Sequence, residues 1–122
     1  MLLNDFFHID QIQKGSFQVK ASLVINKGHK IFEGHFPGQP VVPGVCMMQM
    51  IKEIIEEVTE KKTNCTKVAE MKFLAVIDPV KNNLVEAELK YSLVENMISV
   101  SASITKDELV HFKFKGQFEI LV

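Results

Sequence analysis

The stretch GHFPGQPVVPGVCMMQMIKEIIEE, residues 34–57, changes from a loop into an apolar run at helical spacing. Pro43 stands where a helix can begin, because a proline in the first turn lacks only an N–H that would be unpaired anyway. Gly44 follows, so the backbone amides of Gly44 and Val45 lie at the helix N-terminus with little side-chain bulk around them. Such amides carry partial positive charge and suit an anion or a polarised carbonyl oxygen.

His35 lies a few residues upstream, on a loop stiffened by Pro37 and Pro40. A histidine on a rigid loop beside a helix N-terminus is a candidate acid/base group next to an oxyanion site. The alternative is a histidine that only hydrogen-bonds its own loop, and the surrounding motif favours the substrate-facing role.

The ordered motif HFPGQPVVPGV, residues 35–45, resembles the signature of the β-hydroxyacyl-acyl-carrier-protein dehydratases, small hotdog-fold enzymes of fatty-acid and polyene synthesis. The resemblance implies that His35 moves the C2 proton of a 3-hydroxyacyl thioester while the 3-hydroxyl leaves as water, giving the trans-2-enoyl thioester. It also implies that the N–H of Gly44 or Val45 stabilises the charge on the thioester oxygen. The further substrate-binding positions that it implies are Phe36, Pro43 and Met48. We expect no cofactor.

One position departs from that family's pattern, which has a carboxylate on the helix where this chain has Gln49. A carboxamide can hold a hydroxyl or a water, but it cannot exchange a proton near neutral pH. Glu53 lies one turn on, about 40° around the helix axis and about 6 Å along it, and can substitute as the acid only if the tunnel is differently shaped. We therefore interpret Glu53 as a solvated helix carboxylate. On this interpretation Gln49→Glu raises dehydratase activity and Glu53→Gln changes it little.

Other reactive or adaptable side chains have a structural interpretation beside the functional one. Four methionines either line a flexible apolar acyl tunnel or fill the core; they are Met47, Met48, Met50 and Met71. Cys46 is interpreted as packing, because no base is marked near it in the sequence. His111 alternates with Phe112 in a strand pattern and is expected to face solvent, and the spacing of the histidines predicts no metal site.

The rest of the chain predicts strands around one long helix. Residues 16–25 alternate apolar and polar side chains, as a half-buried strand does, and residues 2–13 predict a short strand or turn. The helix is predicted from residue 43 to about residue 62, with an apolar arc of roughly half its circumference. An antiparallel meander of four strand-like runs follows, joined by turns short enough for hairpins, over residues 66–77, 84–94, 97–105 and 109–121.

One helix against one antiparallel sheet is an α+β two-layer domain, and the resemblance sharpens this to a hotdog fold whose sheet wraps the helix. The length of 122 residues suits one core and not two, so residues 1–122 are expected to form a single hotdog domain. Pairing in a symmetric dimer covers the edge strand that such a sheet leaves open. The resemblance implies a homodimer, or a heterodimer with another hotdog chain.

Composition and charge argue against several function classes. A net charge of −1 gives no pull toward nucleic acid or membrane, and one Tyr with no Trp makes a base-stacking platform unsupported. No apolar run approaches the ~18 residues of a transmembrane helix. The N-terminal residues lack the pattern of a secretory signal, and two cysteines make no disulfide framework. We therefore expect a cytoplasmic protein.

Three functions remain open from the sequence. The first is a dehydratase, or the reverse hydratase, acting on acyl chains carried by an acyl carrier protein or coenzyme A. The second is a catalytically impaired subunit that binds an acyl carrier protein or completes another hotdog chain, to which it can still donate His35. The third is a hotdog thioesterase, which needs a carboxylate or an activated water at the helix start. Gln49 weakens the first and the third.

Overall fold

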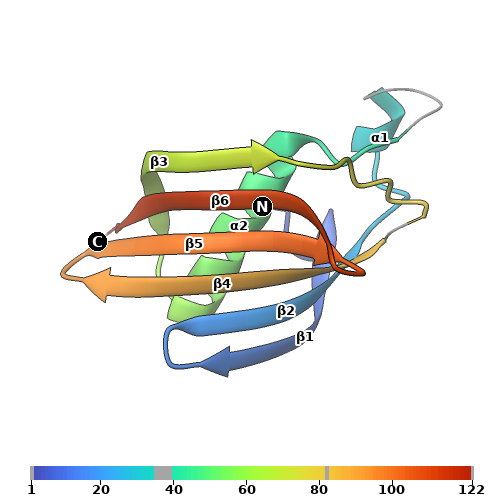
Figure 1. Cartoon of the computed structure of the whole chain (residues 1–122). Coiled ribbons are helices and arrows are strands. Elements are labelled where there is room, and N and C mark those ends of the chain that lie inside the picture. The colour runs from blue at the N-terminus through green and yellow to red at the C-terminus, as the bar shows by residue number, and fades with distance from the viewer. Residues whose placement is uncertain (1, 35–39, 82, 122) are drawn as a thin grey trace.

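A computed structural model describes residues 2–34, 40–81 and 83–121 of the chain (Figure 1). Its elements are, in chain order, the strands β1 (Phe7–Gly15) and β2 (Gln18–Ile25), the one-turn helix α1 (Ile31–Gly34), the long helix α2 (Gly44–Thr59), and the strands β3 (Thr63–Phe73), β4 (Leu84–Val94), β5 (Met97–Lys106) and β6 (Leu109–Ile120). Within the described ranges, no helix is both long and apolar enough to traverse a lipid bilayer.

The six strands form one antiparallel sheet in the order β1-β2-β4-β5-β6-β3. The predicted meander is right for β4, β5 and β6, whose hairpins pair neighbours in sequence. It is wrong for β3, which pairs with β6 and so lies at the edge of the sheet. Helix α2 lies diagonally across the sheet and delivers the chain to that far edge (Figure 1).

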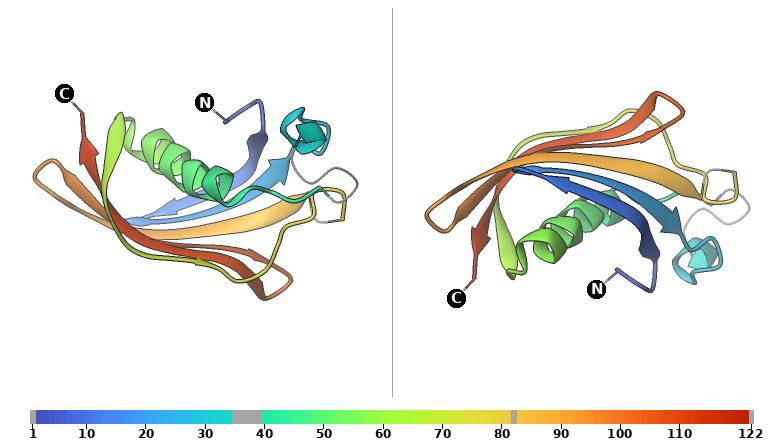
Figure 2. Two further views of the ribbon diagram at one scale, coloured as in Figure 1. Left: turned by 90° about the horizontal axis from the view of Figure 1, so that it is seen from above. Right: turned by 90° about the horizontal axis from the view of Figure 1, so that it is seen from below.

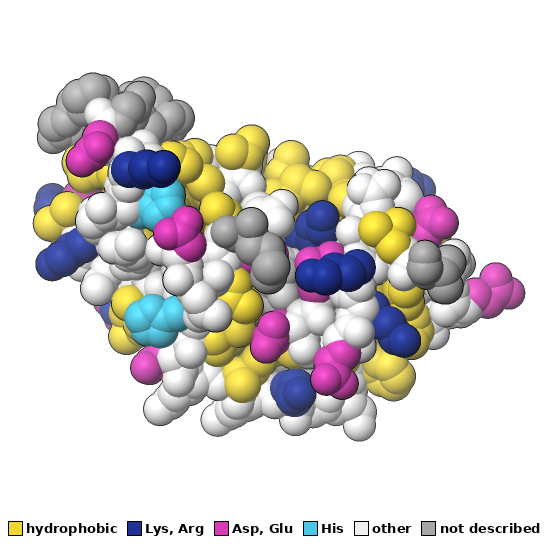
Figure 3. All heavy atoms as spheres, turned by 180° about the vertical axis from the view of Figure 1, so that it is seen from behind, with side chains coloured by type: hydrophobic (Ala, Val, Ile, Leu, Met, Phe, Trp, Pro, Cys, Tyr) yellow, Lys and Arg dark blue, Asp and Glu magenta, His cyan; other side chains and the backbone are white. Residues whose placement is uncertain are grey.

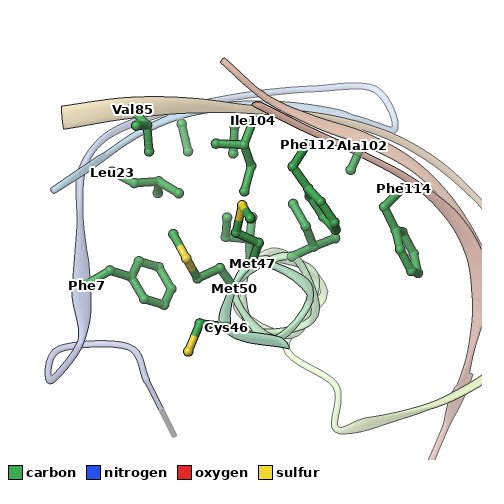
Figure 4. Close-up of a cluster of buried hydrophobic side chains, with 14 of the residues drawn as sticks. Phe7, Leu23, Cys46, Met47, Met50, Val85, Ala102, Ile104, Phe112 and Phe114 are labelled. Atoms are coloured by element: carbon green, nitrogen blue, oxygen red, sulfur yellow. The ribbon is translucent and has the colours of Figure 1, made fainter. Parts of the chain in front are cut away.

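The sheet curves around α2, so the helix lies along its concave face (Figure 2). The apolar stripe of the helix meets the inward side chains of the strands; among the most deeply buried are Met50, Ile51, Ile54, Leu23, Ile104 and Phe112. Figure 4 shows Met47 and Met50 directed from the helix toward the sheet. Full burial of each such side chain stabilises the fold by about 1.5–3 kcal/mol. The predicted architecture, one helix embraced by an antiparallel sheet, is therefore confirmed.

Helix α2 begins close to its predicted start and ends before its predicted end. Pro43 is extended (φ −62°, ψ 145°) and directly precedes the first helical residue. At the other end, Glu60 adopts a left-handed conformation with φ of 57°, which stops the helix three residues before Thr63. The backbone N–H of Thr63 then donates to Glu56 Oε2 at 2.7 Å. This bond fastens the start of β3 to the last turns of α2.

Residues 2–6 form a tight turn before β1, which we call the N-terminal turn. The carbonyl oxygen of Leu2 accepts hydrogen bonds from the N–H groups of Asp5, Phe6 and Phe7, at 3.1, 2.7 and 3.2 Å. The rings of Phe6 and Phe7 are fully buried. In Figure 2 the N-terminal end lies on the side of α2 that the sheet leaves open. The predicted short strand or turn over residues 2–13 is thus both, a turn and then a full strand.

Candidate active site

At the start of α2, no described residue accepts a hydrogen bond from the N–H groups of Gly44 and Val45. The first helical hydrogen bond runs from Cys46 N to Pro43 O at 3.0 Å, so the amides of Gly44 and Val45 precede the intrahelical ladder. Val45 is 79% exposed. Gly44 packs on the ring of Phe73, where an added Cβ would come within 2.7 Å of the ring carbon Cε1. The glycine therefore has a packing reason, and its amide still lies at a helix N-terminus suited to a developing anion.

An apolar groove of about 530 Å³ lies beside this helix start. It is lined by the segment that enters the helix and the segment that leaves β3; Val42, Pro43, Gly44, Met47, Phe73 and Val76 are among its walls. Apolar walls around one polar helix end suit an acyl chain attached to a polar thioester. Pro43 and Gly44, two of the predicted substrate-binding residues, line this groove, and their roles stay predictions.

The four methionines separate in the structure. Met47 lines the groove while it also packs in the core, and Met50 is fully buried. Met48, a predicted substrate-binding residue, is half-buried against the core. Met71 is exposed on β3. The groove therefore brings Met47, rather than Met48, beside the helix start.

Glu53 is not the solvated carboxylate that the sequence predicts, because only 1% of its surface is exposed. Its Oε1 accepts from the backbone N–H groups of Leu2 at 3.0 Å and Leu3 at 2.7 Å, and its Oε2 also lies 2.9 Å from Leu2 N. The N-terminal turn covers this part of the helix and supplies the donors that a buried carboxylate requires. The contacting residues are about fifty positions apart in sequence. The pattern of the helix alone cannot reveal this cover, and it therefore predicts that Glu53 faces solvent.

Gln49 and Glu53 are bonded to each other, one helical turn apart. Gln49 Nε2 donates to Glu53 Oε2 at 2.8 Å. Because a carboxylate can only accept, the chemistry fixes which end of the Gln49 carboxamide faces Glu53. The two residues that the sequence treats as alternatives therefore form one half-buried unit, in which the Gln49 carboxamide donates to the carboxyl group of Glu53.

His35 and Phe36 lie outside the described residues, so their predicted roles stay predictions. The segment just before them is fastened to the N-terminal turn. His29 Nε2 lies 3.1 Å from Asp5 Oδ2, and the ring centroids of Phe32 and Phe6 are 5.5 Å apart. The same turn thus contacts Glu53 on one side and helix α1 on the other, a connection that short-range patterns do not reveal.

Cys46 and His111 are both buried. Burial raises the pKa of the Cys46 thiol, which disfavours the reactive thiolate and fits the packing interpretation. His111 is 1% exposed, so the prediction of a solvent-facing side chain is wrong. The chain after β3 folds over it: His111 Nδ1 lies 3.2 Å from Ala75 O, and Leu74 N donates to His111 O. Among the described residues, no three His, Cys, Asp or Glu side chains cluster as metal ligands.

A family model described as ApeI dehydratase matches residues 11–115 of the chain. The chain belongs to the ApeI-like dehydratase family. Among curated proteins, this ApeI-like chain is 28% identical over 79 residues to the 3-hydroxyacyl-(acyl-carrier-protein) dehydratase FabZ of Blochmanniella pennsylvanica and 25% identical to that of Pectobacterium atrosepticum. Each alignment covers 62% of this chain and 52% of the relative, so the chain spans about half the length of the curated relatives it matches.

Solved structures share the fold of this ApeI-like chain at low identity. The dehydratase heterocomplex ApeI:P from Xenorhabdus doucetiae superposes with a TM-score of 0.74 at 14% identity, over 91% of this chain and 96% of that one. A putative thioesterase from Ralstonia eutropha reaches a TM-score of 0.62 at 10% identity, over 91% and 83%. These likenesses confirm the predicted hotdog fold and show the fold alone.

Proposed function

We propose that this ApeI-like chain is a cytoplasmic dehydratase that eliminates water from a 3-hydroxyacyl thioester carried by an acyl carrier protein or coenzyme A. The observation that carries the proposal is the start of α2, where Gly44 lines an apolar groove of about 530 Å³ and the amides of Gly44 and Val45 precede the helical hydrogen bonds. The ordered motif of residues 35–45 and the family membership support it.

The proposed reaction removes the C2 proton and the 3-hydroxyl. His35 takes the proton from C2, and the charge that develops on the thioester oxygen is stabilised by the Gly44 or Val45 N–H. The C3–O bond then breaks as His35 returns that proton to the departing hydroxyl, so that water and the trans-2-enoyl thioester leave and the histidine is restored. Gln49 orients the hydroxyl by a hydrogen bond and exchanges no proton.

We further propose that the chain works as a pair of hotdog subunits joined at β3. Strand β3 has β6 on one side and an open edge on the other. Exposed apolar side chains gather on β3 and the segment after it; they are Val68, Met71, Phe73, Leu74 and Val76. Figure 3 shows apolar side chains along the upper border of the molecule, where Figure 1 draws β3. Open apolar edges of this kind need a partner strand or another cover.

A second candidate function is a catalytically impaired subunit of a mixed pair. The observation that favours it is Gln49, a group that cannot titrate, at the position of the expected acid. In such a pair this chain contributes its His35, and the partner hotdog chain contributes a carboxylate. The partner is a second copy of this chain in the first proposal and a different hotdog chain in the second.

The experiment that tests both candidates is a dehydration assay on the purified chain. A 3-hydroxyacyl thioester is supplied on coenzyme A and on acyl carrier protein, with and without a co-purified hotdog partner, while native mass spectrometry records the subunits present. Enoyl product from the homodimer supports the dehydratase. Product that appears only with the partner supports the impaired subunit. Absence of product in every arm contradicts both.

A further inference from the structure

The carboxylate of Glu53 is held by several donors at once. In the described part of the chain its partners are all uncharged N–H groups: Leu2 N, Leu3 N and the Nε2 of Gln49, at 2.7–3.0 Å. Both carboxylate oxygens act as acceptors in this arrangement. Since the side chain is 1% exposed and already bound on both oxygens, it is poorly placed to meet a substrate itself. Its hydrogen-bond partner Gln49 is only half-buried and can contact a substrate.

Holding Nε2 of Gln49 also fixes the other end of the carboxamide. The group is planar, and Oε1 lies on the opposite side of Cδ from Nε2. With Nε2 bonded to Glu53 Oε2 at 2.8 Å, Oε1 faces away from Glu53 as an acceptor. A glutamine without this bond would rotate among several rotamers and could present either end. The contact therefore gives Gln49 one orientation and one hydrogen-bonding sense.

We propose that Glu53 is a positioning residue, which fixes Gln49 so that its Oε1 accepts a hydrogen bond from the 3-hydroxyl of the substrate; this rests on the proposed function. The backbone amides of Leu2 and Leu3 hold Glu53 in turn, so the N-terminal turn belongs to the support of the site. A fixed acceptor selects a substrate with a hydroxyl at C3 and aligns its C–O bond for elimination.

The same helix offers a matched control. One turn beyond Glu53, Glu56 Oε2 accepts from Thr63 N at 2.7 Å and from Thr63 Oγ1 at 3.2 Å. This carboxylate fastens the start of β3, seven positions further along the chain, to α2 through a backbone N–H, and it has no hydrogen bond to Gln49 among the described contacts. Glu56→Gln therefore removes a comparable structural clamp without touching the proposed positioning contact.

The test is a double-mutant cycle on turnover in the active assembly, homodimer or mixed pair. The variants are Gln49→Met, Glu53→Gln, the two combined, and the control Glu56→Gln. Each single change at 49 or 53 is expected to lower kcat about tenfold with KM nearly unchanged. Because Glu53 acts through Gln49, the combined variant should be no slower than Gln49→Met alone. The kcat of Glu56→Gln should stay within about twofold of that of the unchanged protein.

A second readout does not depend on turnover. In ¹⁵N-labelled protein, the side-chain amide resonances of Gln49 should shift in Glu53→Gln and stay in place in Glu56→Gln. If Glu53→Gln does not fold, Glu53→Asp replaces it, because the shorter side chain keeps the charge and withdraws it from Gln49.

Three results would overturn the proposal. The first is a combined variant whose fall in kcat is the product of the two single falls. The second is full turnover in Gln49→Met. The third is a set of Gln49 side-chain resonances that do not shift in Glu53→Gln. Turnover by the unchanged protein keeps these failures separate from failure of the proposed function. If the unchanged protein converts no 3-hydroxyacyl thioester in any assembly, the proposed function falls and the positioning role falls with it.

Discussion

Gln49 Nε2 donates a 2.8 Å hydrogen bond to Oε2 of the buried Glu53, one turn further along helix α2. The carboxyl group of the pair lies farther from the helix start than the carboxamide does. Any group that contacts Gln49 therefore meets a carboxamide whose partner, Glu53, is held by the backbone of the N-terminal turn.

This pair changes what Gln49→Glu is expected to do. The new carboxylate would face Glu53 at hydrogen-bond distance, and two like charges in a poorly solvated site repel each other. We predict a loss of about 1–3 kcal/mol in the free energy of unfolding. The exchange variant Gln49→Glu with Glu53→Gln should recover most of this loss, because one carboxylate and one carboxamide face each other again. Chemical denaturation of the three variants measures both effects, and equal stability of the single and exchanged variants would contradict this reading.

The exchange variant also tests an added acid at position 49 without placing two carboxylates against each other. From the sequence alone, Gln49→Glu by itself is expected to raise dehydratase activity, and Glu53→Gln to matter little. Because Glu53 is buried and hydrogen-bonded, Glu53→Gln is expected to matter after all. The single change Gln49→Glu is expected to destabilise the fold, so its activity alone does not isolate the effect of an added acid. We predict that the exchanged protein is faster than the unchanged chain in a dehydration assay of the isolated subunit. A slower exchanged protein would contradict the expectation that a titrating acid at position 49 speeds the elimination.

Gly44→Ala should strain the contact between the helix start and β3. The added methyl group would lie 2.7 Å from Cε1 of Phe73, well inside van der Waals contact. We expect a loss of about 1–3 kcal/mol in unfolding free energy. Phe73→Leu should relieve most of it in the double variant, since the smaller side chain makes room. Thermal unfolding of the two single variants and the double variant measures how far the two stability changes are coupled. Stability losses that simply add would contradict a steric contact between positions 44 and 73.

The buried thiol of Cys46 should resist alkylation. Burial raises its pKa, so the thiolate becomes populated only at higher pH than for an open cysteine, and the side chain is 4% exposed. Cys65 on β3 is partly exposed and serves as the internal comparison. We predict that iodoacetamide labels Cys46 at least about tenfold more slowly than Cys65 near neutral pH, and that the rate at Cys46 rises as the pH is raised. Peptide mass spectrometry over time gives both rates, and similar labelling would mean that the helix start opens readily.

His35→Ala tests the proposed base. Loss of a general base lowers a rate typically by about 10²–10⁴-fold. We expect a fall in this range with the far-ultraviolet circular dichroism and the subunit assembly unchanged. The comparison is His8→Ala, a change to an exposed histidine on β1. Turnover that survives in a folded His35→Ala protein would remove His35 from the chemistry.

Local patterns predict most of the fold and only part of the site. Alternating side chains mark the strands, and a first-turn proline followed by an apolar stripe marks helix α2, because these signals depend on near neighbours in sequence. The position of β3 beside β6 depends on where the helix delivers the chain, which no local pattern encodes. For the same reason Glu53 and His111 are misplaced by the sequence: each is covered by a segment far away along the chain, the N-terminal turn in one case and the residues after β3 in the other.

The helix-start part of the site follows from local chemistry. Pro43 and Gly44 are recognisable as a helix entry, and both line the groove beside the start of α2. The link from Gln49 through Glu53 to Leu2 could not be found that way, because its carboxylate lies at an ordinary polar position of the helical pattern. A buried charge can be identified only when the segment that covers it is known.

The most direct test of the central claim is the reverse reaction in D₂O. The active assembly is incubated with a trans-2-enoyl thioester, and the product is analysed by mass spectrometry and NMR. If the chain is a hydratase and dehydratase that uses His35, the product is the 3-hydroxyacyl thioester with one deuterium fixed at C2, and His35→Ala forms it at least about 100-fold more slowly. Release of the free acid instead would identify a thioesterase, and recovery of unchanged enoyl thioester from every assembly would contradict the account.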